Sequence, residues 1–96
     1  MIFLTRESDL SYSSGLLYFY SSEHAFPLGE MMFRLISKLD NSYDITCIDL
    51  FYFKKMYKRF DIEEIPTILV IKDGAEIKRI NGIPLIKDID NILKKD

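Results

Sequence analysis

The chain has 96 residues, of which 48% are hydrophobic and 29% are charged, as is typical of one globular domain with a single modest core. Thirteen basic and fifteen acidic residues give a net charge of −2, without the basic excess typical of nucleic-acid-binding proteins. The single cysteine excludes an internal disulfide. The apolar runs are too short to span a bilayer, and the N-terminus lacks the features of a signal peptide. We therefore expect one cytoplasmic domain, residues 1–96.

The first half of the chain alternates predicted strands and helices. Residues 2–4 are expected to form an edge strand, and Thr5 is a candidate N-cap for a weak or short helix over residues 5–14. The unbroken bulky run 16–20 predicts a central strand that is buried on both faces. After a loop, a helix is expected to start near Pro27. Its apolar stripe comprises Leu28, Met31, Met32, Leu35, Ile36 and Leu39.

A second strand and a second helix follow. Residues 45–48 are largely β-branched and predict a buried strand, in which Cys47 would be a small buried hydrophobic residue. The next helix is expected to bury Phe53, Met56, Tyr57 and Phe60. Its other side carries Lys54, Lys55, Lys58 and Arg59. These four charges are interpreted as a solvated face, with a site for phosphate or an acidic partner as the alternative.

Residues 65–82 predict a β-hairpin. A buried strand follows Pro66, and Asp73-Gly74 supplies the left-handed conformation that a tight turn requires. In the outer strand Glu76, Lys78 and Asn81 alternate with Ile77 and Ile80. A last helix is expected from Pro84, with the stripe Leu85, Ile86, Ile89, Ile92 and Leu93. The whole order predicts an α/β fold, a three-layer α/β/α arrangement with a central mixed sheet and a C-terminal β-hairpin plus helix.

This order and four short segments resemble the thioredoxin family. Leu16 to Phe19 is similar to the family's central strand, Ile65-Pro66-Thr67 to its proline loop and Lys72-Asp73-Gly74 to its hairpin turn. Gly82 falls at the family's late glycine beside the active site. The resemblance implies a thioredoxin-like fold over nearly the whole chain and a cis peptide bond before Pro66.

The chain departs from the family at the catalytic motif. Redox-active members carry Trp-Cys-Gly-Pro-Cys at the start of the long helix, where this sequence has Glu23-His24-Ala25-Phe26-Pro27. His24 and Pro27 thus stand where the family has its two thiols, and neither can carry out thiol–disulfide exchange. As the only histidine, His24 lacks the further ligands that a metal site needs. We expect no catalytic residue, no metal and no cofactor.

Three aromatic residues occupy other family positions. Tyr18 replaces the buried acid that assists proton transfer, and a phenol cannot do this near neutral pH. Tyr20 replaces a tryptophan, and Phe51 replaces the acid that this tryptophan contacts. We therefore expect Tyr20 and Phe51 to pack together as an aromatic pair.

The resemblance also implies a surface that grips extended polypeptide. Its residues here would be Glu23, His24, Ala25, Phe26, Ile65, Pro66 and Gly82. Phe33, beside the stripe of the long helix, is either a further partner contact or a flank covered by a neighbouring loop. We expect a redox-inactive thioredoxin-like protein that acts as a protein-binding or structural module. Its partner would be a protein or an extended peptide, and neither nucleic acid nor a membrane.

Two alternatives stay open. The chain is an oxidoreductase that uses the single cysteine Cys47, or it is an obligate subunit of a larger assembly that Phe26 and Phe33 anchor. The sequence favours a non-enzymatic role over an enzymatic one, because a single buried thiol reacts poorly.

Overall fold

The computed structural model describes residues 1–10, 14–23, 28–39, 43–82, 87–88 and 91. Within these ranges five strands form one sheet in the order β1-β3-β2-β4-β5. The strands are β1 (Ile2–Phe3), β2 (Gly15–Tyr20), β3 (Ile45–Asp49), β4 (Thr67–Lys72) and β5 (Ala75–Asn81). Strands β1 and β2 run parallel to β3, whereas β4 is antiparallel to β2 and β5. The predicted mixed sheet is therefore confirmed.

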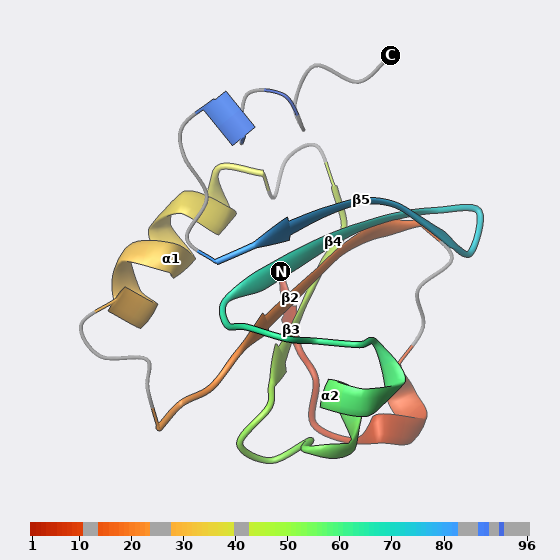
Figure 1. Cartoon of the computed structure of the whole chain (residues 1–96). Coiled ribbons are helices and arrows are strands. Elements are labelled where there is room, and N and C mark those ends of the chain that lie inside the picture. The colour runs from red at the N-terminus through yellow and green to blue at the C-terminus, as the bar shows by residue number, and fades with distance from the viewer. Residues whose placement is uncertain (11–13, 24–27, 40–42, 83–86, 89–90, 92–96) are drawn as a thin grey trace.

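The helices cover both faces of this sheet. Helix α1 (Leu28–Ser37) lies on one side, and helix α2 (Lys55–Arg59) and the short 3-10 helix η1 (Glu7–Asp9) lie on the other (Figure 1). This arrangement confirms the predicted three-layer α/β/α fold. No helix in the described part of the chain is long and apolar enough to cross a membrane.

Strand β2 divides the core into two clusters. Tyr18 packs with Ile36 of α1 on one face, and Phe19 packs with Met56 of α2 on the other. Tyr18 and Phe19 reach different clusters because successive residues of a strand point to opposite faces. All four side chains are almost completely buried. The prediction of a central strand buried on both faces is thus confirmed. A side chain such as Phe19 contributes about 1.5–3 kcal/mol by its burial.

The weak or short helix expected over residues 5–14 is confirmed only in part, and Thr5 as its N-cap is wrong. Among the described residues of this segment the chain makes the single turn η1, whose N-cap is Arg6, which has extended backbone angles and no side-chain cap. The Arg6 Nε donates a hydrogen bond to Asp9 Oδ2 at 3.0 Å, which closes the turn within three residues. Residues 11–13 of the expected helix lie outside the described residues.

Helix α1 agrees with its predicted stripe where the structure describes the side chains. Ile36 is fully buried, as is Leu39 just beyond the helix, and Leu35 packs against the same cluster. The expected start at Pro27 and end at 40–42 lie outside the described residues, as do the apolar side chains of the expected C-terminal helix.

Helix α2 buries less of its predicted stripe than expected. Met56 is fully buried, and Phe53 and Phe60 pack partly against the same cluster. Tyr57 is 37% exposed, so its predicted burial is wrong. The helix has only five residues, and one step of about 100° from Met56 turns Tyr57 away from the sheet.

The hairpin forms as predicted, with one correction in its outer strand. Asp73 and Gly74 have φ angles of 52° and 80°, which confirms the left-handed turn. A register shift between Val70 and Ile71 interrupts the pairing of β4 with β5. Ile77, which lies opposite this irregularity, is 61% exposed, whereas Ile80 is buried. Ile77 and Ile80 are three residues apart, so strict alternation already places them on opposite faces of the strand. The register shift in addition leaves Ile77 without a paired residue on β4.

Candidate functional site

The candidate site lies at one end of the sheet. The register places Tyr20 beside Asp49, and it places Phe19 beside Thr67, which in turn pairs with Asn81. The chain therefore leaves β2, β3 and β5, and enters β4, at the same end (Figure 1). Loops that are far apart in sequence meet there.

The proline loop enters β4 at this end. The peptide bond between Ile65 and Pro66 is cis. The N–H of Gly82 donates to the carbonyl of Pro66 at 2.7 Å, and the hydroxyl of Thr67 donates to the carbonyl of Glu64. Gly82 has a φ of +76°, and a Cβ there would lie 3.1 Å from Glu64 Oε1. A glycine is favoured at this position because the positive φ opposes an L side chain, and an added Cβ would also require the exposed Glu64 carboxylate to move.

Ile65 has a buried side and an open side. Its side chain packs against the core cluster of α2. Its backbone N–H and C=O make no hydrogen bond to any residue in the described part of the chain, and the residue is partly exposed. Among the described residues these two backbone groups therefore have no hydrogen-bond partner.

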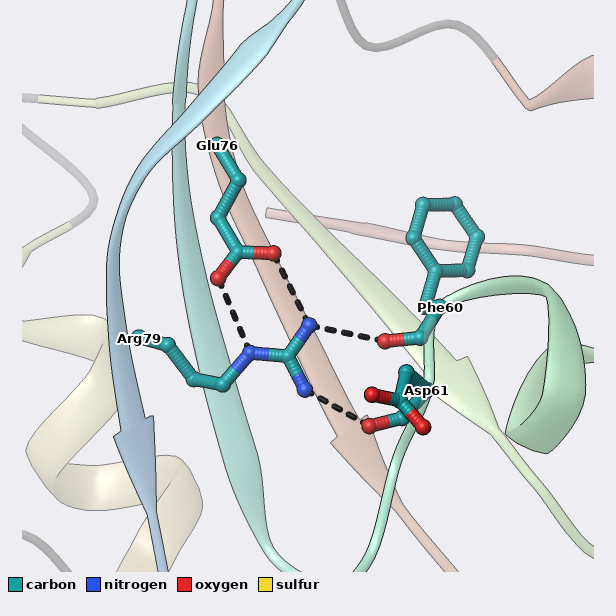
Figure 2. Close-up of polar contacts among 4 residues, drawn as sticks. All are labelled: Phe60, Asp61, Glu76 and Arg79. Carbon is teal, nitrogen blue, oxygen red and sulfur yellow. Dashed lines mark hydrogen bonds and ion pairs between the residues drawn. The ribbon is translucent and has the colours of Figure 1, made fainter.

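Arg79 fixes the chain that leads into this loop. Its guanidinium lies between Glu76 on β5 and the carbonyls of Phe60 and Asp61 after α2 (Figure 2). It donates to the two carboxylate oxygens of Glu76 at 2.9 and 2.8 Å, to Phe60 O at 2.7 Å and to Asp61 O at 2.8 Å. The hydrogen bond with Arg79 holds the pKa of Glu76 below its ordinary value. The Arg79 side chain thus joins the end of α2 to β5.

Asp49 is an organising residue that the sequence analysis missed. Its side chain is at the end of β3, and Oδ1 accepts the N–H of Ser22 and that of Phe51, both at 3.0 Å. One carboxylate oxygen therefore holds the loop after β2 and the loop after β3 together. An acidic residue that directly follows an apolar strand was the available signal.

A cluster of aromatic rings lies between β2 and α1. Phe33 meets Tyr18 and Tyr20 edge-on, with ring centroids 5.5 and 5.1 Å apart, and Phe3 at 5.6 Å. Phe33 is thus a partly buried ring that packs within its own chain. This agrees with the alternative that the flank of the helix at Phe33 is covered within the chain. The cover, however, comes from aromatic rings of the sheet and not from a neighbouring loop. Burial raises the pKa of Tyr18, and it raises that of Tyr20 to about 12 with a smaller contribution from Asp49.

The expected Tyr20–Phe51 pair is wrong. Tyr20 stacks on Tyr18 at 5.4 Å, because both point to the α1 face of β2. Phe51 packs instead against Tyr52 at 4.9 Å, and the Lys54 Nζ lies 5.8 Å from its ring centroid. Phe51 follows Asp49 in a loop on the opposite side of the strand end, which keeps the two rings apart.

The remaining candidates are placed as follows. Glu23 is exposed in the turn after β2, whereas His24, Ala25 and Phe26 lie outside the described residues. Cys47 is 1% exposed and lies beside Tyr18 on the neighbouring strand. Among the described residues no His, Cys, Asp and Glu side chains gather into a group that would hold a metal ion.

Comparison with solved structures identifies the fold. The chain superposes on a mutant thioredoxin from Halobacterium salinarum with a TM-score of 0.80 and 14% identity, over 97% of this chain and 87% of that one. For the reduced thioredoxin pre-protein of Schistosoma mansoni the TM-score is 0.76 and the identity 22%, over 97% and 95%. For the thioredoxin of Malassezia sympodialis they are 0.77 and 14%, over 97% and 88%. No family model and no curated protein matches the sequence. These likenesses show the thioredoxin fold.

Proposed function

We propose that this protein is a redox-inactive thioredoxin-fold module that binds an extended polypeptide segment at the proline loop. The observation that carries the proposal is the open backbone of Ile65, whose N–H and C=O make no hydrogen bond within the described part of the chain. An extended segment that lies beside a free backbone pairs with it as an added strand does.

The composition of the chain argues against thiol chemistry. Exchange of a disulfide needs one thiolate to attack and a second to release the mixed disulfide. The sequence has one cysteine, and Cys47 is 1% exposed in the core. Its neighbour on β2 is the phenol of Tyr18, whose raised pKa keeps it protonated near neutral pH. Tyr18 therefore does not provide a base that could take the proton of the Cys47 thiol.

The loop is held in a way that suits recognition. The hydrogen bond from Gly82 to Pro66 fixes one side of the loop, and Arg79 fixes the preceding chain at Phe60 and Asp61. A preorganised backbone loses little entropy when a partner binds. Two backbone hydrogen bonds contribute roughly 0.5–1.5 kcal/mol each, so we expect weak affinity unless side chains add contacts.

Amide chemical shifts test the site. Peptides selected from a random display library on the full chain would be titrated into isotope-labelled protein. We expect the largest shifts at Ile65, Thr67 and Gly82, with none at the distant Asp73-Gly74 turn. A matched peptide that is N-methylated at its central bond should bind about two- to tenfold more weakly, because it loses one hydrogen-bond donor to the loop. Equal binding of both peptides, or shifts confined to other surfaces, would refute the proposal.

Insulin reduction tests the oxidoreductase alternative. The full chain should show no more activity than the reducing system alone, and Cys47→Ser should be indistinguishable from it. Activity that is clear in the natural protein and lost in Cys47→Ser would establish thiol chemistry and would overturn the redox-inactive part of the proposal.

A further inference from the structure

A second surface, separate from the proline loop, combines exposed aromatic rings with positive charge. A surface pocket is lined by Glu7 of η1 and by residues 51–55. Phe51 is 38% exposed and Tyr52 is 71% exposed, and Tyr57 of α2 is exposed as well. Large rings at these exposures offer apolar contact area that the chain itself does not cover. We call Phe51, Tyr52, Lys54, Lys55 and Lys58 the α2 surface.

The charges of this surface are poorly compensated within the chain. Lys54, Lys55 and Lys58 form no ion pair with any carboxylate in the described part of the protein. Lys55 and Lys58 are three residues apart on this helix of five residues, and its N-cap, Lys54, is four residues before Lys58, so like charges are neighbours. Such pairs destabilise a helix by roughly 0.2–0.5 kcal/mol each.

Three arginines elsewhere in the protein are arranged differently. Arg6, Arg34 and Arg79 each pair at 2.8–3.0 Å with an acid three or four residues away. Of the four cations at α2, only Arg59 forms an ion pair in the described part of the chain, with Glu7 at 4.0 Å. The helix has no acidic residue in its first turn and no side-chain cap. Lys54, Lys55, Lys58 and Arg59 thus gather four positive charges within six residues, with one ion pair to a described acid.

We propose that the α2 surface binds an acidic polypeptide segment of a partner protein. The carboxylates of the segment pair with Lys55 and Lys58, and an aromatic or aliphatic side chain between them packs against Phe51 and Tyr52. The charge of the surface selects acidic partners, and the exposed rings supply apolar contact.

The same observations disfavour a nucleic acid as the ligand. Glu7 forms part of the pocket wall, and the chain as a whole has a net charge of −2. A long phosphate backbone would extend past the four cations at α2 and would be repelled by the negative net charge of the rest of the chain. A short acidic segment can stay within about 10 Å of these cations, which is about one Debye length.

Fluorescence anisotropy on the full chain tests the inference. The probe is a short labelled peptide of aspartate and glutamate with two phenylalanines, and its control has asparagine and glutamine in place of the acids. We expect the acidic peptide to bind and the amide peptide to bind about tenfold more weakly or worse. Raising the salt from about 50 to about 300 mM should weaken the acidic peptide strongly, because exposed charges are screened.

A pair of matched variants locates the site. Lys55→Glu/Lys58→Glu should lower the affinity by about tenfold or more. Lys38→Glu/Lys72→Glu changes the net charge by the same amount at two exposed lysines outside the α2 surface, and it should change the affinity less than about twofold. Amide shifts of the unmodified protein should fall within residues 51–58, which tests the site without any substitution.

Three results would overturn the inference. The first is an equal loss of affinity in both double variants, and the second is a set of peptide-induced shifts outside residues 51–58. The third is tighter binding of a single-stranded oligonucleotide than of the acidic peptide, lost in Lys55→Glu/Lys58→Glu, which would assign the surface to nucleic acid.

Discussion

Replacing Arg79 with methionine removes the guanidinium and retains much of the apolar stem. Two of the four hydrogen bonds that this group donates join β5 to the end of α2, and the other two go to Glu76 on β5 itself (Figure 2). The variant leaves the carbonyls of Phe60 and Asp61 without their donor and Glu76 without its cation. We therefore expect the segment that leads to the proline loop to loosen.

The size of the effect follows from how exposed each partner is. The Arg79 side chain is 23% exposed and that of Glu76 is 39% exposed, so the ion pair itself contributes at most about 1 kcal/mol. The two carbonyls accept from a charged donor, and with partial exposure we assign about 1 kcal/mol to each. The total is about 2–3 kcal/mol, which corresponds to a fall in Tm of roughly 10–20 °C for a domain of this size.

Urea unfolding of three variants separates the contributions. Arg79→Met should lose the full amount, and Arg79→Lys should lose most of it because one ammonium cannot reach all of these acceptors. Lys72→Met, the same kind of change at an exposed residue, should stay within about 0.5 kcal/mol of the natural protein. If Arg79→Met unfolds at the same urea concentration as the natural protein, Arg79 does not hold α2 to β5.

The pH dependence of the same variants gives an independent check. The pKa of Glu76 is held below its ordinary value of 4.5 by Arg79. Its contribution to stability is therefore present above pH 4.5 and is lost as the pH falls through the lowered pKa. Glu76→Gln should remove this part of the acid sensitivity at a cost below about 1 kcal/mol at neutral pH. A larger loss than in Arg79→Met would show that the carbonyl hydrogen bonds contribute little.

Three further predictions concern the site. Burial raises the pKa of Tyr20 to about 12, so this phenol ionises at lower pH in the unfolded chain than in the folded one. The free energy of unfolding should therefore fall as the pH rises above 10. Urea unfolding of Tyr20→Phe should show a shallower fall. Asp49→Ala leaves two loop N–H groups without their acceptor and should cost about 2–3 kcal/mol in urea unfolding, and Asp49→Asn, which keeps one carbonyl oxygen, should cost less. Gly82 and Gly74 have similar φ angles of 76° and 80°, so Gly82→Ala and Gly74→Ala should each lower the free energy of unfolding by about 1–2 kcal/mol. Peptide titration should show weaker binding only for Gly82→Ala, whose added Cβ lies against Glu64 in the proline loop.

Each of these predictions can fail in a distinct way. Equal alkaline sensitivity of the natural protein and Tyr20→Phe would remove the phenol as its cause. A neutral Asp49→Ala would show that water replaces the carboxylate in both loops. A Gly74→Ala variant that weakens peptide binding as much as Gly82→Ala would separate binding from the geometry of the proline loop.

The main elements could be predicted from the sequence because their signals are local. The continuous run of β2 and the Asp73-Gly74 turn each fix a conformation through the residues that they contain. The missing strand partner of Ile77 could not be predicted in this way. It depends on a register shift at Val70 and Ile71 on the partner strand, and one strand's alternation carries no information about such a shift.

The errors at the site have a similar origin. Tyr20 and Phe51 were expected to meet because the family has two contacting residues at these positions. Here Asp49 takes both loop N–H groups and directs the chain after β3, so that Phe51 meets Tyr52. The sequence could not decide between a partner contact and a covered flank for Phe33. Helical spacing gives the direction of a side chain, but it does not say which rings of the strands lie opposite it.

The two edges of the sheet bear on whether copies of this chain pair with one another. In the described part of the chain β1 is only two residues long, which is too short to template a strand from another molecule. Strand β5 contains the register shift and the charged residues Glu76, Lys78 and Arg79. Short, bulged or charged edges oppose edge-to-edge pairing with a strand of another molecule. Both edges of the sheet therefore discourage self-association, while the backbone of Ile65, which has no hydrogen-bond partner among the described residues, can pair with a partner segment.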